Sequence, residues 1–430
     1  MPPRFNTVPR GQRTWVRTSL AVALACASGA PVAAQSRGMF VPSISIGTVH
    51  DDNLFSTRRA VDDYLTQLRP TLEGIFKSPT VDIRSEANFD MQLSARHAAL
   101  NTFDARRHAM FDGKLQRSPA LGFGLVGRYD ASQTPSELNL ETGIILPRQR
   151  AQRVQLTPSL SYRTTPRTTV TTQYDWTTES LSTWAGGDLH VARFAVARQL
   201  SARTTLSAHY LGRLFVDHEG LRGPAPSVGI AIPEEALQRP SLPAETRWSQ
   251  TVMLGWSRQL TPLTRMSLQA GPRLTSYRGL TSEILATVVR RTPHSRFLTD
   301  YWHGETIVLG ILGPVRTHSG TMKWTRTVRR NLDLGVNLGA FRSMTIDRAT
   351  ARVLHAAATG AWLFGDHYIL TASYGADFQQ GDIRSTFMSN ERIRRGVFLV
   401  RLTIRPRPRA GVELPEDPES PSIPVKGVIK

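Results

Sequence analysis

Cysteine is almost absent from this chain, with one residue, Cys26, in 430. It lies in an N-terminal stretch with the parts of a secretory signal: a positively charged start, an apolar core from Leu20 to Ala27, and a small-residue cleavage pattern ending at Ala34. A lipidated Cys26 is the alternative, which Ala23 disfavours because a bulky apolar residue is usual there. Cleavage after Ala34 leaves no cysteine, so disulfides and cysteine-ligated metal sites are excluded.

Long hydrophobic runs are also missing. No segment approaches the roughly 18 to 20 consecutive apolar residues that a membrane helix needs. This absence does not exclude a membrane protein, because the strands of a membrane β-barrel alternate in polarity and each gives only a weak hydropathy signal.

Acidic residues are scarce beside basic ones, with 34 Asp and Glu against 53 Lys and Arg. Removal of the four signal arginines leaves 49 basic and 34 acidic residues, an excess of 15. Such a balance is typical of proteins that bind nucleic acid or anionic surfaces. Export argues against nucleic acid, so the expected partners are anionic lipid head groups, lipopolysaccharide, acidic polysaccharide or small anions.

The sequence is rich in alternation between apolar and polar residues. In the clearest run, from Val81 to Arg96, apolar residues occupy odd positions such as Phe89, and polar residues occupy even positions such as Asp90. A helix would scatter these residues around its surface, whereas a strand sorts them onto two faces. The run exceeds the usual strand length of about 3 to 10 residues and suits a tilted membrane strand.

The alternating stretches predict an all-β fold, an antiparallel up-and-down transmembrane β-barrel of about 18 strands. Sixteen strands is the alternative, because residues 279–330 are ambiguous by one hairpin. Tight turns alternate with longer polar connectors near 50–63, 97–106, 135–150, 219–245, 309–316 and 382–393, with short exceptions near 279–281 and 346–349. Outer-membrane barrels show this pattern, with short periplasmic turns and longer extracellular loops. A soluble β-sandwich or propeller is disfavoured because no second apolar face is present.

Three regions follow from this interpretation. Residues 1–34 are the signal peptide, and residues 35–405 are the barrel. Residues 406–430 form a flexible tail whose six prolines interrupt any strand ladder. With an even number of strands the tail emerges on the periplasmic side. The expected location is the bacterial outer membrane.

Residues 49–72 carry a resemblance to a known family. The segment has a D-x-N-x-F element made by Asp51, Asn53 and Phe55, an acidic loop with Asp62 and Asp63, and then an L-x-P-x-L second strand. It resembles a group of proteobacterial outer-membrane β-barrels that are porin-like and often encoded beside exopolysaccharide and exosortase genes. The resemblance implies a barrel that continues to residue 405. Many such barrels end on an aromatic residue, whereas this last strand ends at Ile404-Arg405-Pro406.

The polar face of each strand is expected to line the lumen. A barrel of 16 to 18 strands encloses an aqueous channel, and charged walls bias which ions enter. The alternative is that these charges only hydrate the lumen or cancel in cross-strand pairs. The lumen-facing candidates are Arg84, Glu86, Asp90, Arg96, Lys114, Arg128, Asp130, Arg193, Arg213, Arg273, Lys323 and Arg401.

An oxygen-rich cluster flanks the first loop, at Asp51, Asp52, Asn53, Asp62 and Asp63. Calcium takes such ligands, but the spacing lacks the glycine and distal glutamate of an EF-hand loop. Asx-type turns are the simpler interpretation, and no metal is expected.

Catalytic motifs are missing. The nearest approaches are His50-Asp51-Asp52, Asp217-His218 and Asp366-His367, and neighbouring residues on a strand point to opposite faces. No catalytic residue and no cofactor are expected.

The sequence therefore predicts an outer-membrane channel or accessory barrel for export or passage of anionic or saccharide solutes. The first alternative is a non-conducting structural barrel that anchors a surface polysaccharide or a periplasmic partner; long loops folded into the lumen would favour it. The second is a barrel enzyme. Expected partners are outer-membrane lipid, lipopolysaccharide, the barrel-assembly machinery, and exopolysaccharide or small anions.

Overall fold

The computed structural model describes residues 36–139, 141–182, 184–218, 245–311, 313–381 and 392–406. The predicted signal at 1–34 lies outside these ranges, as does all but the first residue of the predicted tail at 406–430. None of the helices in the described residues is long and apolar enough to cross a membrane.

The described chain contains eighteen strands and two single-turn 3-10 helices, η2 (Ala98–Leu100) and η3 (Pro135–Glu137). The strands are β1 (Arg37–Asp51), β2 (Asp63–Lys77), β3 (Val81–Ser94), β4 (Thr102–Gln116), β5 (Leu121–Ser132), β6 (Ala151–Thr165), β7 (Thr168–Leu181), β8 (Trp184–Ser201), β9 (Thr204–Asp217), β10 (Thr246–Thr261), β11 (Thr264–Thr275), β12 (Gly279–Thr292), β13 (Ser295–Thr306), β14 (Val315–Arg329), β15 (Leu332–Met344), β16 (Thr350–Phe364), β17 (Tyr368–Gln380) and β18 (Arg392–Ile404).

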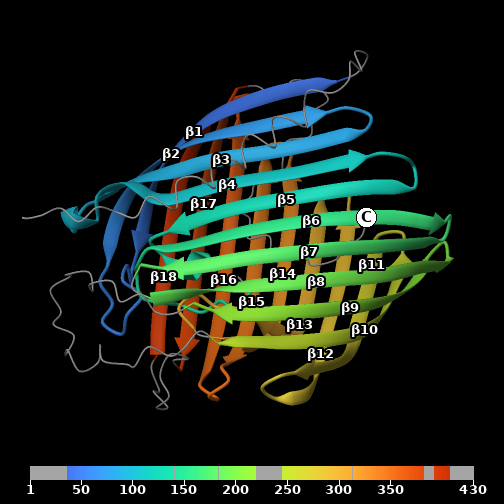
Figure 1. The fold of residues 1–430 in the computed structure, drawn as a ribbon. Coiled ribbons are helices and arrows are strands. Elements are labelled where there is room, and N and C mark those ends of the chain that lie inside the picture. The colour runs from blue at the N-terminus through green and yellow to red at the C-terminus, as the bar shows by residue number, and fades with distance from the viewer. Residues whose placement is uncertain are drawn as a thin grey trace, which may run out of the picture.

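The strands form one closed antiparallel barrel. Each strand pairs with its neighbour in the chain, and β1 pairs with β18 from Ile44↔Ile404 to Asp51↔Val397. Figure 1 shows the two walls, with the blue-to-green strands in front of the yellow-to-red strands. Closure gives both end strands a second neighbour along the seam, so within the ring each strand finds its backbone partners in the protein. Residues 37–43 of β1 extend past the seam and pair with β2 alone. The predicted fold and the count of 18 are confirmed, and residues 279–330 keep both of their hairpins.

Side-chain burial is the reverse of that in a soluble β-protein. On β3 the polar residues Glu86, Asp90 and Gln92 are buried, whereas Phe89 and Leu93 are exposed. Large apolar side chains are exposed along the other strands too, and Phe40 is 77% accessible. An apolar exterior around a polar interior is the arrangement of a barrel that spans a lipid bilayer.

The two ends of the barrel differ in their connectors. Those at one end have two to four residues each, as in 166–167 and 202–203. The other end carries the longer connectors 52–62, 95–101, 133–150, 218–245, 307–314 and 381–391, with short connections at 182–183, 276–278 and 345–349. Strand β1 begins and β18 ends at the short-turn end.

Several boundaries depart from the sequence prediction. The alternating run Val81–Arg96 ends as a strand at Ser94, because the chain turns there into η2, and β4 already begins at Thr102, within the connector expected near 97–106. The polarity pattern also predicts a connector over 183–187, which shrinks to 182–183 because β8 begins at Trp184 and Gly187 pairs with Glu179. Gly186 makes this possible, since a Cβ atom there would lie 1.7 Å from the carbonyl oxygen of Glu179.

The alternation on β3 makes a testable prediction. Ala87→Arg places a cation on the outer face at mid-strand, and it should lower the free energy of unfolding in vesicles by about 2 to 4 kcal/mol. Asn88→Arg, one residue along on the inner face, is the matched control and should cost much less. Guanidinium titration followed by tryptophan fluorescence measures both, and equal losses would contradict the assigned faces.

Candidate functional site: the barrel lumen

Loop 133–150 crosses the lumen at the long-loop end. It joins β5 to β6, yet the N–H of Ile145 donates to Oε1 of Gln379 on β17 at 2.7 Å. Ile144 and Leu146 on either side are 1% and 2% exposed. A loop that is buried and bonded to a distant strand of the ring must lie inside the barrel.

Loop 307–314 contacts loop 133–150 inside the barrel. The N–H of Leu309 donates to Oδ1 of Asn139 at 3.3 Å, and Thr306 donates to Glu141 at 2.5 Å. Together the loops and the wall bury a hydrophobic cluster within the polar lumen. Its members are Leu138, Ile144, Leu146, Ala151, Leu181, Val308, Leu309, Val315, Phe341, Ala351 and Val353.

Two glycines allow the loops to pack this closely. Gly143 has a φ of 62°, and a Cβ atom there would lie 2.8 Å from the ring of Phe341. Gly310 has a φ of 74°, and a Cβ atom there would lie 2.6 Å from the Leu181 side chain. Only glycine adopts this backbone conformation without strain and leaves room for the wall. Gly143 and Gly310 therefore allow both loops to pack inside the barrel.

Loop 133–150 also carries a positive charge into the lumen. The Arg148 guanidinium donates to Oε1 of Gln133 at 3.2 Å, and its backbone N–H donates to the carbonyl of Phe55 at 3.2 Å. Burial lowers the pKa of Arg148, Glu137 raises it and Arg395 lowers it again. Arginine nevertheless stays charged throughout the accessible pH range.

The inner wall between β9 and β13 carries a network of buried charges. Arg213 on β9 forms a two-pronged pair with Glu283 on β12, at 2.8 and 2.5 Å, and Thr251 on β10 bonds to both. Arg273 on β11 is fully buried, 3.6 Å from Glu283 and 3.2 Å from Glu305. Charges buried this deeply require partners, and each of these has at least one.

Other inner-face charges are paired across neighbouring strands in the same way. These cross-strand pairs are Arg69 with Asp90, His108 with Asp130, Arg153 with Glu179, Arg193 with Asp175, and His355 with Asp377. Arg128 also pairs with Asp130, within β5. Such pairing corresponds to the alternative stated from the sequence, in which the lumen charges cancel in cross-strand pairs.

The predicted lumen residues fall into distinct environments. Buried positions are occupied by Glu86, Asp90, Arg213, Arg273 and Arg401, and Asp130 also lies deep in the wall. The side chains of Arg84 and Lys114 lie near the short turns and are 49% and 68% exposed, beside Asp82 and Asp112. Lys323 lies mid-strand on β14, partly buried. Which of these groups meets a passing solute stays a prediction.

Arg96 is placed differently from the prediction. It lies after the end of β3, its side chain is 53% exposed, and it pairs with Asp62. Its guanidinium lies 5.9 Å from the centre of the Tyr64 ring, which is exposed on the outer face of β2. The turn at Ser94 ends the strand alternation, so Arg96 lies at the outer rim and not in the lumen.

Several acidic partners of the inner-wall arginines were not predicted from the sequence, among them Glu283, Glu305, Glu179 and Asp175. The missed acids lie on strands, and Glu283, Glu179 and Asp175 lie at inward positions. A search for acidic residues on the polar face of each strand would have found these three. It would not have paired Arg213 with Glu283, which are separated by two intervening strands.

The D-x-N-x-F element ties the first strand to the last. Asp51 accepts a bond from Arg395 on β18 at 2.7 Å and from the N–H of Asn53 at 3.0 Å, the latter an Asx turn. The amide of Asn53 donates to the carbonyls of Thr57 and Arg394, both at 2.8 Å. Phe55 packs edge-on against His97. These contacts fasten the seam where β1 meets β18.

The acidic cluster of this loop is engaged with N–H and O–H donors. Asp63 accepts bonds from His97 at 2.9 Å, from the N–H of Arg96 at 3.1 Å, and from Ser94. The carboxylate of Asp52 accepts the N–H of Gly396 at 2.5 Å. No set of three metal-ligating side chains gathers within the described ranges.

The three His–Asp neighbours do not form dyads. His50 stacks near Tyr64, 4.6 Å between ring centres, whereas Asp51 binds Arg395. His218 pairs with Asp188, and Asp217 pairs with Arg247. His367 contacts the carbonyl of Arg405 near the short-turn end.

The β9–β12 network makes a prediction about stability. Glu283→Ala should lower the free energy of unfolding by about 3 to 5 kcal/mol because it removes the partner of buried guanidinium groups. Arg213→Ala should cost less, since Glu283 keeps Arg273. The double variant should cost less than the sum of the two, as measured by denaturant titration. Lys114→Ala, which breaks an exposed pair, is the control, at about 0.2 to 1 kcal/mol; additive losses would contradict the network.

Comparison with known proteins returned solved structures only. No family model and no curated protein matches the chain. OccK2 of Pseudomonas aeruginosa is 10% identical with a TM-score of 0.43, covering 86% of this chain and 98% of that one. OccK5 of the same organism is 10% identical with a TM-score of 0.41, covering 85% of this chain and 98% of that one. The siderophore receptor PirA of Pseudomonas aeruginosa is 8% identical with a TM-score of 0.39, covering 86% of this chain and 81% of that one. Similarity at this level gives no information about the solute or the mechanism of this chain. Its own closed eighteen-stranded barrel, apolar outside and polar inside, is that of a bacterial outer-membrane protein.

Proposed function

We propose that this barrel is an outer-membrane channel for small anionic or saccharide solutes, with loops 133–150 and 307–314 as its constriction. The observation that carries the proposal is the polar, charged inner wall of a closed eighteen-stranded ring, a size that encloses an aqueous lumen. The exposure of Arg84 and Lys114 supports a water-filled lumen near the short-turn end. The loops narrow the opposite end.

A second candidate is a non-conducting barrel that anchors a surface polysaccharide or a periplasmic partner. The apolar cluster beneath the loops favours it, because a dry core inside the lumen resists the passage of ions. The resembled barrels are often encoded beside exopolysaccharide genes, and an association of this chain with exopolysaccharide stays a prediction under either candidate.

Release of the loops distinguishes the two candidates. Ile144→Asp places a carboxylate in the apolar cluster, where an unpaired charge is unfavourable, so the loop should leave the lumen and the single-channel conductance in planar bilayers should rise. Ile144→Val, which costs about 0.5 to 1.5 kcal/mol, should leave the conductance at the level of the unaltered protein. A barrel that stays silent at every voltage in all three forms contradicts the channel and supports the structural candidate.

Ion preference tests the anionic part of the proposal. The paired wall charges largely cancel, so the partly buried Arg148 of loop 133–150 should contribute most to anion preference. Arg148→Glu should shift the reversal potential in a salt gradient toward cations. Arg59→Glu, at an exposed position of loop 52–62, should shift the reversal potential less, most clearly near 0.1 to 0.15 M salt, where the Debye length is about 8 to 10 Å. Cation preference in the unaltered protein would refute the proposal.

A further inference from the structure

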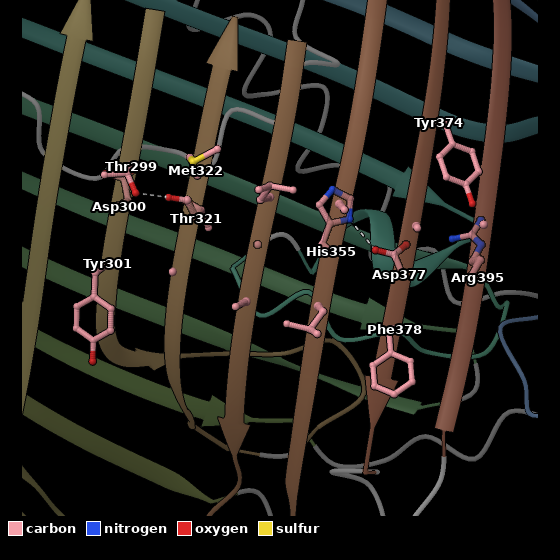
Figure 2. Close-up of a pocket in the computed structure, with 18 of the residues that line it drawn as sticks. Thr299, Asp300, Tyr301, Thr321, Met322, His355, Tyr374, Asp377, Phe378 and Arg395 are labelled. Carbon is pink, nitrogen blue, oxygen red and sulfur yellow. Dashed lines mark hydrogen bonds and ion pairs between the residues drawn. The ribbon is translucent and has the colours of Figure 1, made fainter.

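A groove crosses the outside of the barrel from β12 to β18. It has a volume of about 950 Å³. Figure 2 views this wall, with Tyr301, Tyr374 and Phe378 among the side chains that line the groove. Tyr374 and Tyr301 are among the exposed large side chains of the barrel, so the groove opens outward, toward lipid.

Small residues at neighbouring outer-face positions create the groove. Two adjacent rows of register partners cross the wall. One contains Ala286, Gly320 and Ala340, and the next contains Ala356, Ala376 and Gly396. Larger side chains border them, including Leu354 and Phe378 toward the loops and Met322 and Leu338 toward the turns. The result is an apolar trough in a surface that is otherwise covered by large side chains.

A row of arginines lies immediately above the groove, toward the long-loop end. Arg342 on β15 is the register partner of Arg352 on β16, and Arg392 on β18 lies in the same row through Gln380 of β17. Arg394, one row deeper, lies over the Phe378 ring at 5.6 Å. Register partners share a face, so all four guanidinium groups project from the outer surface.

These four arginines lack acidic partners among the described residues, unlike the arginines of the inner wall. On the outer side of the groove the acidic lining residue is Asp52, which already accepts the N–H of Gly396. Asp300 and Asp377 belong to the opposite, inner face of their strands, and Figure 2 shows Asp377 bonded to His355. The outer surface above the groove is therefore strongly positive.

The position of the arginine row along the barrel axis corresponds to one of the two membrane interfaces. Ten residues along β15 separate Arg342 from Leu332, the register partner of the exposed Trp362. At about 3.3 Å per residue and a tilt of about 40°, this spans roughly 25 Å, the height of the apolar band of such barrels. Trp362 then lies at the short-turn interface, and the arginines lie at the head-group level of the leaflet on the long-loop side.

We propose that this surface is a specific binding site for one phosphorylated glycolipid of the outer leaflet, a molecule of the lipid A type. Its phosphates bind Arg342, Arg352, Arg392 and Arg394, and one of its acyl chains fills the groove. Arginine pairs with phosphate through two parallel hydrogen bonds, and the small residues admit a chain that larger side chains would exclude. The site does not depend on whether the lumen conducts.

Charge favours this occupant over a second copy of the chain. A symmetric contact through this wall would bring two sets of unpaired arginines together, and like charges repel. A phosphate-bearing lipid supplies both the anion and the apolar chain that the two parts of the surface require.

The test uses the full-length protein in detergent, freed of lipid, with hexa-acyl lipid A bisphosphate as the probe and native mass spectrometry as the readout. The unaltered barrel should retain one lipid. Arg342→Gln with Arg352→Gln and Arg392→Gln should reduce retention about tenfold or more, because charge-assisted bonds are lost. Ala356→Phe with Ala376→Phe should reduce it by filling the groove. Arg107→Gln, an outward arginine on β4 that pairs with Asp104 at 2.6 Å, should leave retention unchanged.

Heat-modifiable migration on gels checks that each variant is folded, and Arg392→Gln alone serves if the triple variant is not. Equal retention by all variants overturns the proposal. Equal retention of dephosphorylated lipid A shows that phosphate is not recognised, and equal retention of phosphatidylglycerol shows that the glycolipid is not; either outcome overturns it. A dimer mass that the groove-filling variant abolishes would make a second copy the occupant instead.

Discussion

The structure depends on the pairing of β1 with β18. In a bilayer an unpaired backbone N–H or C=O costs several kcal/mol. A sheet in which each strand pairs only with its neighbours in the chain would leave β1 and β18 as open edges, so it is stable in the membrane only when these two strands pair. Eight register pairs make the seam. The bond from Arg395 to Asp51 and those from Asn53 to the backbone fasten its long-loop end. The D-x-N-x-F element is therefore a closure element in this fold.

Closure also creates the environment that the charged residues occupy. Once the ring is closed, the polar face of every strand is enclosed together with two loops, and arginines such as Arg213 and Arg273 lose most of their contact with water. They pair there with acids on other strands. The outer wall shows the opposite case, where Arg342 and Arg352 project without acidic partners in the described structure. Most charges of the inner wall are therefore paired within the protein, whereas this part of the outer wall carries an excess of positive charge.

Much of the fold follows from local pattern. Alternation has a period of two, which assigns each strand residue to a face without knowledge of its neighbours, and turn residues mark the hairpins. For that reason the sequence could predict the number of strands, the division into an end with short turns and an end with long connectors, and the inward-facing positions of Arg213 and Arg273. Arg96 was misplaced because alternation does not reveal where a strand stops. The early start of β8 was missed because its cause is a close backbone approach at Gly186.

The sequence by itself determined the barrel, its polarity and the faces of its strands, since those depend on residues one and two positions apart. Only the tertiary structure decided which charges pair, where loops 133–150 and 307–314 dock, and where small residues from six strands gather on the outer wall. Those features join residues far apart in the chain, such as Ile145 with Gln379 and Arg213 with Glu283. Their proximity depends on the register of each strand and on ring closure, which no local periodicity contains.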